Sequence, residues 1–123
     1  MTPLEAVLQR LALRRGVHYV ANHESSFWLR TRLVDLDVRA RTGQLESCAH
    51  LVPGTTSHAA LWSNRLVCTA CVPTLRLSGE ADRTCDRCER VFAGVHPIVL
   101  AAGEHLLVTA GLCSNCCRRE VGW

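Results

Sequence analysis

The chain has 123 residues, fourteen of them arginine and none lysine, with a formal net charge of +3. Nearly half of the residues are apolar but only 5% are aromatic, which predicts a single domain whose modest core needs a further source of stability. No apolar run approaches the roughly 18 residues of a membrane span, and the N-terminus has no hydrophobic signal core, so we expect a cytoplasmic protein with no membrane contact.

Residues 1–45 are predicted to form a platform of one helix and a β-hairpin. In "MTPLEAVLQRLALRRG", Thr2 is placed as an N-cap and Glu5 completes a capping box. An apolar stripe gives this helix one face for packing on its own domain or, alternatively, on a partner: Leu4, Val7, Leu8 and Leu11. The stretch "VHYVA" is predicted to be a short strand. The stretch "FWLRTRLVDLDVRA" is predicted to be a long strand because apolar residues alternate along much of it.

Four pairs of metal-ligand residues follow in residues 46–123, which we expect to pack with the platform as one compact unit. The pairs are separated by 17, 13 and 24 residues: Cys48/His50, Cys68/Cys71, Cys85/Cys88 and Cys113/Cys116. A Cys-x-x-Cys turn points both sulfurs at one centre, and a reducing cytoplasm disfavours disulfides, so the spacings indicate metal sites. Eight ligands fill two tetrahedral Zn²⁺ sites, one Cys₃His and one Cys₄.

The way in which the pairs combine has alternatives. We favour sequential pairing, with a Cys₃His site in residues 48–71 and a Cys₄ site in residues 85–117, over crossed or nested pairing. His58 competes with His50 as the first site's histidine, and four thiolates also suit an iron–sulfur cluster. Cys117 is left over, and a competing arrangement uses Cys113 with Cys117 in place of Cys116. The role of Cys117 stays open at this point.

The segment between the last two pairs predicts a strand, "RVF", followed by a hairpin, "HPIVLAAGEHLLVTAGL", with "GEH" at the turn. Residues 85–117 therefore resemble the zinc-ribbon group, in which a hairpin connects two metal knuckles. The resemblance concerns spacing and strand pattern and covers about a quarter of the chain. Together with the N-terminal helix, these elements predict an α+β fold.

No catalytic pattern is recognisable, since the chain lacks a phosphate-binding loop, a nucleophile with a base, and the zinc-deaminase signature. We therefore expect a non-enzymatic protein held together by closed metal sites. Seven thiolates and two Zn²⁺ would bring the net charge from +3 to zero, so a basic surface must come from local clustering. Five arginines surround the second site, interleaved with Asp82, Asp86, Glu89 and Glu120: Arg83, Arg87, Arg90, Arg118 and Arg119.

These arginines predict a regulatory protein that binds DNA, another nucleic acid or the transcription machinery, because guanidinium groups form paired contacts with phosphate and guanine. The first alternative is a zinc-stabilised adaptor that binds a protein through the N-terminal helix or an edge of the ribbon. The second is a thiol redox switch in which Arg118 and Arg119 lower the pKa of Cys117. The sequence does not predict an oligomeric state.

Overall fold

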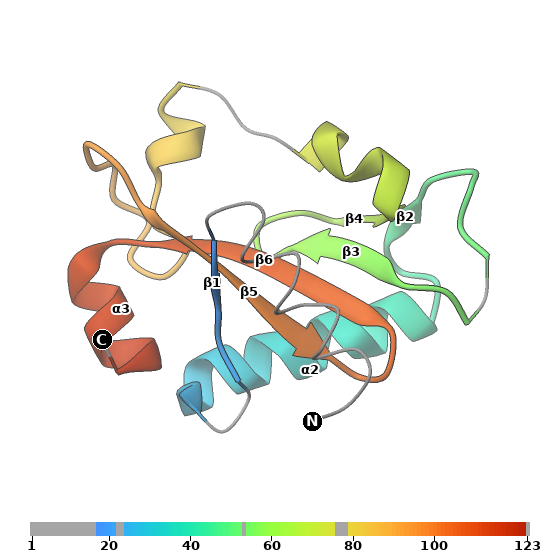
Figure 1. Cartoon of the computed structure of the whole chain (residues 1–123), viewed down its shortest axis with the longest axis horizontal. Helices are drawn as coiled ribbons and strands as arrows, with labels where there is room; N and C mark the ends of the chain where they lie inside the picture. Colours follow the sequence, from blue (N-terminus) through green and yellow to red (C-terminus); the bar gives the residue numbers. More distant parts are fainter. Residues whose placement is uncertain (1–16, 22–23, 53, 76–78, 123) are drawn as a thin grey trace.

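A mixed β-sheet forms the centre of the computed structural model, which describes residues 17–21, 24–52, 54–75 and 79–122. Within these residues, six strands pair in the order β1-β5-β6-β3-β4-β2 (Figure 1). Their bounds are β1 His18–Tyr19, β2 Glu46–Ser47, β3 Ser57–Ala60, β4 Arg65–Cys68, β5 His96–Ala102 and β6 Leu106–Leu112. Helices and a mixed sheet confirm the α+β class. The helix expected in residues 2–16 lies outside the described residues.

The predicted hairpin is confirmed as the antiparallel pair β5 and β6, paired from His96↔Leu112 to Ala102↔Leu106. Gly103 begins the turn with φ +60°, a left-handed conformation that favours glycine, and a Cβ atom there would lie 2.5 Å from Asp37 Oδ1 and displace that side chain. The strand predicted at "RVF" is reduced to an isolated bridge between Thr84 and Val91. The hairpin is the central element of the sheet, since β1 flanks β5 and β3 flanks β6.

The predicted long strand is wrong, and with it the β-hairpin platform, because helix α2 spans Phe27–Arg41. Ser26 caps this helix, its Oγ accepting a hydrogen bond from the Leu29 N–H at 3.1 Å. Leu29, Leu33 and Leu36 recur at helical spacing and are buried against the sheet. The short strand predicted at "VHYVA" is confirmed as β1, which pairs in parallel with β5.

The outer face of α2 explains why its sequence resembles that of a strand. Phe27, Val34 and Val38 lie opposite the buried leucines and are exposed by 80%, 63% and 41%. Apolar residues on two opposite faces of a helix produce a near-alternation that imitates the period of a strand. Charged residues one helical turn apart form two ion pairs on α2, Asp35–Arg39 at 3.6 Å and Asp37–Arg41 at 3.2 Å.

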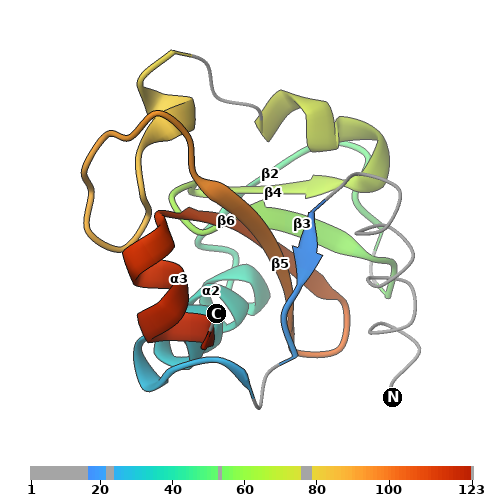
Figure 2. The same ribbon diagram turned by 60° about the vertical axis from the view of Figure 1, so that its left-hand side comes forward.

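Helices α2 and α3 cover the same side of the sheet (Figure 2). Helix α3, Ser114–Val121, follows β6 directly. Two 3₁₀ helices, η2 Thr69–Leu75 and η3 Ala81–Arg83, lie between β4 and β5 along the chain. The main core lies between helices α2 and α3 and the sheet, and includes Ile98, Leu100 and Val108. No helix in the described part of the chain is long and apolar enough to cross a membrane.

Candidate metal centres

The structure brings the eight predicted ligand residues together in two sets. The first cluster contains Cys48, His50, Cys68 and Cys71, and the second cluster contains Cys85, Cys88, Cys113 and Cys116. Within each cluster, one ligand atom per residue lies within 4.8 Å of all the others. Ligands about 2.3 Å from a tetrahedral Zn²⁺ are roughly 3.8 Å apart, so a small contraction would complete each site. Both clusters can therefore hold a metal ion, and the grouping is the sequential one.

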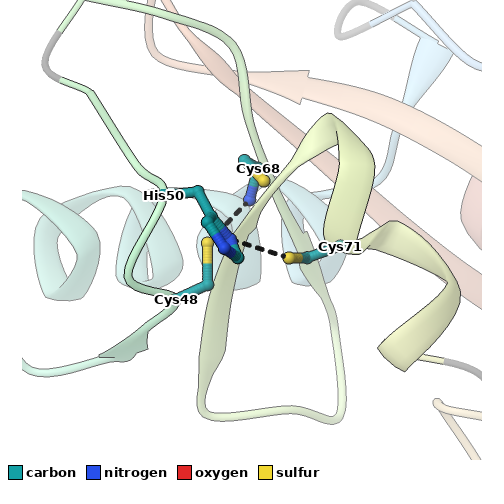
Figure 3. A group of neighbouring side chains, drawn as sticks. All are labelled: Cys48, His50, Cys68 and Cys71. Atoms are coloured by element: carbon teal, nitrogen blue, oxygen red, sulfur yellow. Dashed lines mark hydrogen bonds between the residues drawn. The ribbon is translucent and has the colours of Figure 1, made fainter.

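Parallel pairing of two strands positions the first cluster. Strand β2 pairs with β4, and the Cys48 N–H continues this ladder by donating to the Leu66 carbonyl at 3.0 Å. This places Cys48 beside Cys68, whose N–H donates to the Cys48 sulfur at 3.3 Å (Figure 3). Cys71 lies at the start of η2, and its sulfur is 3.3 Å from His50 Nδ1. The end of β4 and the following 3₁₀ turn thus supply two ligands, and the turn after β2 supplies the other two.

An arginine side chain fixes η2, and with it Cys71. The Arg65 guanidinium donates to the Thr74 carbonyl at 2.9 Å and to Thr74 Oγ1 at 3.0 Å, while Thr74 Oγ1 donates to the Cys71 carbonyl at 2.6 Å. His58, the competing histidine, lies outside the cluster on β3. It is buried, with its Nε2 3.0 Å from Thr69 Oγ1. His50 is therefore the histidine positioned as a ligand.

The first knuckle of the second cluster is a tight backbone turn. The Cys85 N–H donates to the Arg90 carbonyl at 2.9 Å, and the Glu89 N–H donates to the Cys85 carbonyl at 2.9 Å. Glu89 has φ +62°, a left-handed conformation that disfavours residues with a side chain. This turn brings Cys85 and Cys88 to one side of the chain, as the Cys-x-x-Cys spacing predicts.

Asp86 connects this knuckle to strand β6. Its N–H donates to the Gly111 carbonyl at 2.8 Å, and its carboxylate accepts from the Gly111 N–H at 2.7 Å. Burial raises the pKa of Asp86 to about 6, although the Gly111 N–H and the Arg32 charge act in the opposite direction. A Cβ atom at Gly111 would lie 2.7 Å from a Val95 methyl group, so a side chain there would displace Val95. These contacts hold Cys85 close to Cys113, two residues beyond Gly111.

The second knuckle coincides with the start of helix α3. Cys113 is the N-cap residue, and Cys116 lies in the first turn. Cys117 is 1% exposed, lies outside the cluster, and donates from its thiol to the Leu112 carbonyl at 3.7 Å. Burial raises the pKa of Cys117 to about 11, so the expectation that neighbouring arginines lower it is wrong.

A buried carboxylate joins helix α3, helix α2 and the second cluster. Glu120 is 3% exposed, accepts a hydrogen bond from the Ser26 hydroxyl, and lies 3.3 Å from Arg87 Nε. The Arg87 guanidinium also lies over the Trp28 ring, 4.8 Å from its centroid. Arg87, one residue before the ligand Cys88, is thereby engaged by Glu120 and Trp28, although its side chain is 38% exposed. Glu120, one of the acids interleaved with the arginines in the sequence, forms the centre of this network.

The thiols of each cluster have pKa values that differ widely. The Cys68 N–H lowers the pKa of Cys48 to about 6, whereas hydrogen bonding to Cys68 raises that of Cys71 to about 11. Burial raises the pKa of Cys85, but backbone N–H groups outweigh it and bring the value to about 7. Burial raises the pKa of Cys116 to about 12. One thiol of each cluster ionises readily, while further thiolates beside it need a cation to offset their repulsion.

A cleft of about 800 Å³ opens beside the first cluster, between α2, the β5–β6 turn and the chain that follows His50. Apolar side chains line much of it: Ala40, Leu51, Val52, Leu66 and Leu106. Asp37, Arg41, Glu104 and His105 contribute the charged and polar part of the lining. Sequence reasoning did not find this cleft, because its walls come from four separate segments. Asp86, Ser26 and Trp28 were missed as supporting residues for the same reason.

The second cluster differs in two ways from the ribbon that residues 85–117 resemble. Its second knuckle opens a helix, and its hairpin belongs to a larger sheet, with β3 beside β6 and β1 beside β5 at Ile98 and Val99. The edge of β5 that was expected to receive a partner is thus partly covered by β1. No protein-family model, curated protein or solved structure matches this chain. The function must therefore be inferred from the two clusters and the surfaces around them.

Proposed function

We propose that this chain is a non-enzymatic, two-zinc regulatory protein that binds nucleic acid or the transcription machinery. Zinc fits both donor sets, because Cys₄ and Cys₃His sites with every ligand supplied by the protein are typical of structural Zn²⁺. The histidine of the first cluster and the long hairpin within the second favour zinc over an iron–sulfur cluster. When bound, each ion stabilises the fold by neutralising thiolates and joining segments distant in sequence.

The observation that carries the nucleic-acid proposal is the arrangement of charge at the second cluster. Four arginines are exposed and lie within three residues of a ligand: Arg83, Arg90, Arg118 and Arg119. Two of the four interleaved acids point inward, Asp86 to the Gly111 N–H and Glu120 to Ser26 and Arg87. Of these four acids, Asp82 and Glu89 are left to offset the exposed arginines. Arg87 is removed from the proposed binding set because it packs on Trp28.

A matched pair of double variants tests this proposal. Arg118→Ala with Arg119→Ala removes two charges at the second cluster, and Arg39→Ala with Arg41→Ala removes two from the far end of α2, about 20 Å along that helix. We expect only the Arg118→Ala/Arg119→Ala variant to weaken binding to duplex DNA or RNA. Its plot of log affinity against log salt should also be less steep, the slope falling in magnitude by about 0.7–0.9 per lost phosphate contact. Fluorescence anisotropy across a salt series measures both effects. Absence of salt-sensitive binding in the unmodified protein would refute the proposal.

The second candidate function, a zinc-stabilised protein adaptor, is favoured by the cleft beside the first cluster. Its apolar lining includes Val52, which is 60% exposed, and its volume suits a partner's side chains. A photo-crosslinking residue at position 52 should then join a partner present in the source cells, whereas one at Val91, an exposed valine near the second cluster, should not. Equal crosslinking at both positions would contradict this adaptor function.

A further inference from the structure

The two clusters differ in their relation to the hydrophobic core. Cys85, Cys113 and Cys116 of the second cluster are 0–4% exposed and belong to the main core, which also contains the leucines of α2 and of the β5–β6 hairpin. The first cluster contributes no side chain to either core cluster among the described residues. Its His50 is exposed, and its three cysteines are half-buried.

The backbone around the first cluster is held by fewer core contacts than that around the second, since Leu51, which follows His50, is only partly buried against the core. Strand β2 has two residues and lies at the edge of the sheet, and η2 follows the next strand. Opening this edge breaks the β2–β4 ladder and the Arg65–Thr74 contacts, whereas opening the second cluster separates α3 from β6 and exposes buried sulfur. Local openings that expose little apolar surface need far less free energy than global unfolding.

The first cluster also holds one wall of the cleft. Cys48 and His50 anchor the chain immediately before Leu51 and Val52, which line the cleft together with Gly54, Thr55 and Ser57. Asp37 and the β5–β6 turn also line the cleft, and they belong to elements anchored in the core. A metal ion at the first cluster therefore restrains one wall only.

From these observations we infer that the two metal ions have different roles. The ion of the second cluster is part of the folded core, and the ion of the first cluster exchanges in the folded protein and sets the position of the cleft wall formed by residues 51–52 and 54–57. This inference rests on the proposed binding of two ions. It makes the first cluster the regulatory site of the protein, with free Zn²⁺ as its ligand and the cleft as the surface that responds.

Chelator challenge followed by thiol labelling tests the first part. The full chain is loaded with two equivalents of Zn²⁺, exposed to excess chelator in native buffer, and pulsed with N-ethylmaleimide, and the modified cysteines are identified by peptide mass spectrometry. We expect Cys48, Cys68 and Cys71 to react at least about 100-fold faster than the buried sulfurs of the second cluster, with one zinc retained. Cys117, buried but not a ligand, is an internal control because it reacts only if the core opens.

Each outcome of this experiment is decisive. Labelling of Cys117 together with Cys48, or release of both ions in one step, would overturn the inference while leaving the two-zinc proposal intact. A chain that binds no zinc after refolding with it would overturn both. Selective labelling of the first cluster with Cys117 unmodified supports the inference.

Hydrogen exchange tests the coupling to the cleft. Loss of the first ion, either by chelation or in Cys71→Ser, should accelerate amide exchange at least about tenfold in residues 51–52 and 54–57 and leave β5 and β6 unchanged. Cys117→Ser, which removes a buried thiol outside the clusters, is the matched control and should show no change in that segment. Unchanged exchange in the cleft wall after one-ion release would refute the coupling.

Discussion

The two clusters contain nearly the same ligands, yet they occupy opposite environments. The second cluster lies where helix α3 leaves the sheet, and three of its sulfurs pack in the main core. The first cluster lies at the edge formed by β2 and β4, with an exposed histidine. Similar ligand spacing therefore defines where a metal can bind, but it leaves open whether the ligands lie in the core or at the edge of the sheet.

Equivalent ligand substitutions should have unequal effects. Cys116→Ser should abolish cooperative folding, because a structural Zn²⁺ contributes on the order of 10 kcal/mol and this sulfur lies in the core. Cys71→Ser should lose one zinc but retain a cooperative transition. Thermal unfolding followed by circular dichroism, with zinc quantified by elemental analysis, measures both. Similar loss of stability in the two variants would contradict the comparison.

Removing the Glu120 carboxylate should destabilise the packing that supports the second cluster and leave the first cluster unaffected. Glu120→Ala leaves the Ser26 hydroxyl and Arg87 without their partner, and should lower the free energy of unfolding by about 2–3 kcal/mol. Glu104→Ala is the control, since that side chain is 93% exposed and should change stability little. Urea titration measures the loss. A Glu120→Ala protein as stable as the control would show that this network does not support the second cluster.

Cys117→Ser should leave two zinc ions bound, whereas Cys113→Ser and Cys116→Ser should each lose the second ion. The Cys117 thiol lies outside the cluster, so its replacement costs only the burial of a more polar hydroxyl, about 1–2 kcal/mol. Zinc stoichiometry of the three variants is the measurement. Loss of zinc in Cys117→Ser with retention in Cys116→Ser would reverse the assignment of the two adjacent cysteines.

The smallest expected effect is a gain in stability at the first knuckle of the second cluster. Glu89 has φ +62°, so Glu89→Gly should relieve backbone strain and raise the free energy of unfolding by about 1 kcal/mol. Glu80→Gly, at φ −63°, is the matched control and should give no gain. Urea titration of the zinc-loaded proteins distinguishes them. A loss of stability in Glu89→Gly would mean that the Glu89 side chain contributes a contact that outweighs the strain.

Sequence reasoning was reliable where function depends on local spacing. The knuckles at Cys85/Cys88 and Cys113/Cys116 and the hairpin between them follow from short-range turn geometry and strand alternation, and the structure has them at the predicted positions. It failed at Phe27–Arg41, where apolar residues on both faces of the helix imitate a strand. The i,i+4 ion pairs and the Ser26 cap were the signals that indicate a helix there.

The sequence alone identified the four ligand pairs and the central hairpin, because each knuckle and the hairpin turn depend on residues close together in the chain, whereas the structure selected the sequential grouping of the pairs and His50 over His58. Tertiary structure alone decided which set joins the core, that Asp86 and Glu120 point inward, and that Arg87 packs on Trp28. These outcomes depend on contacts between segments separated by 25 or more residues, such as Asp86 with Gly111. Spacing along the chain carries no information about which distant surface a side chain will meet once helices and sheet have packed.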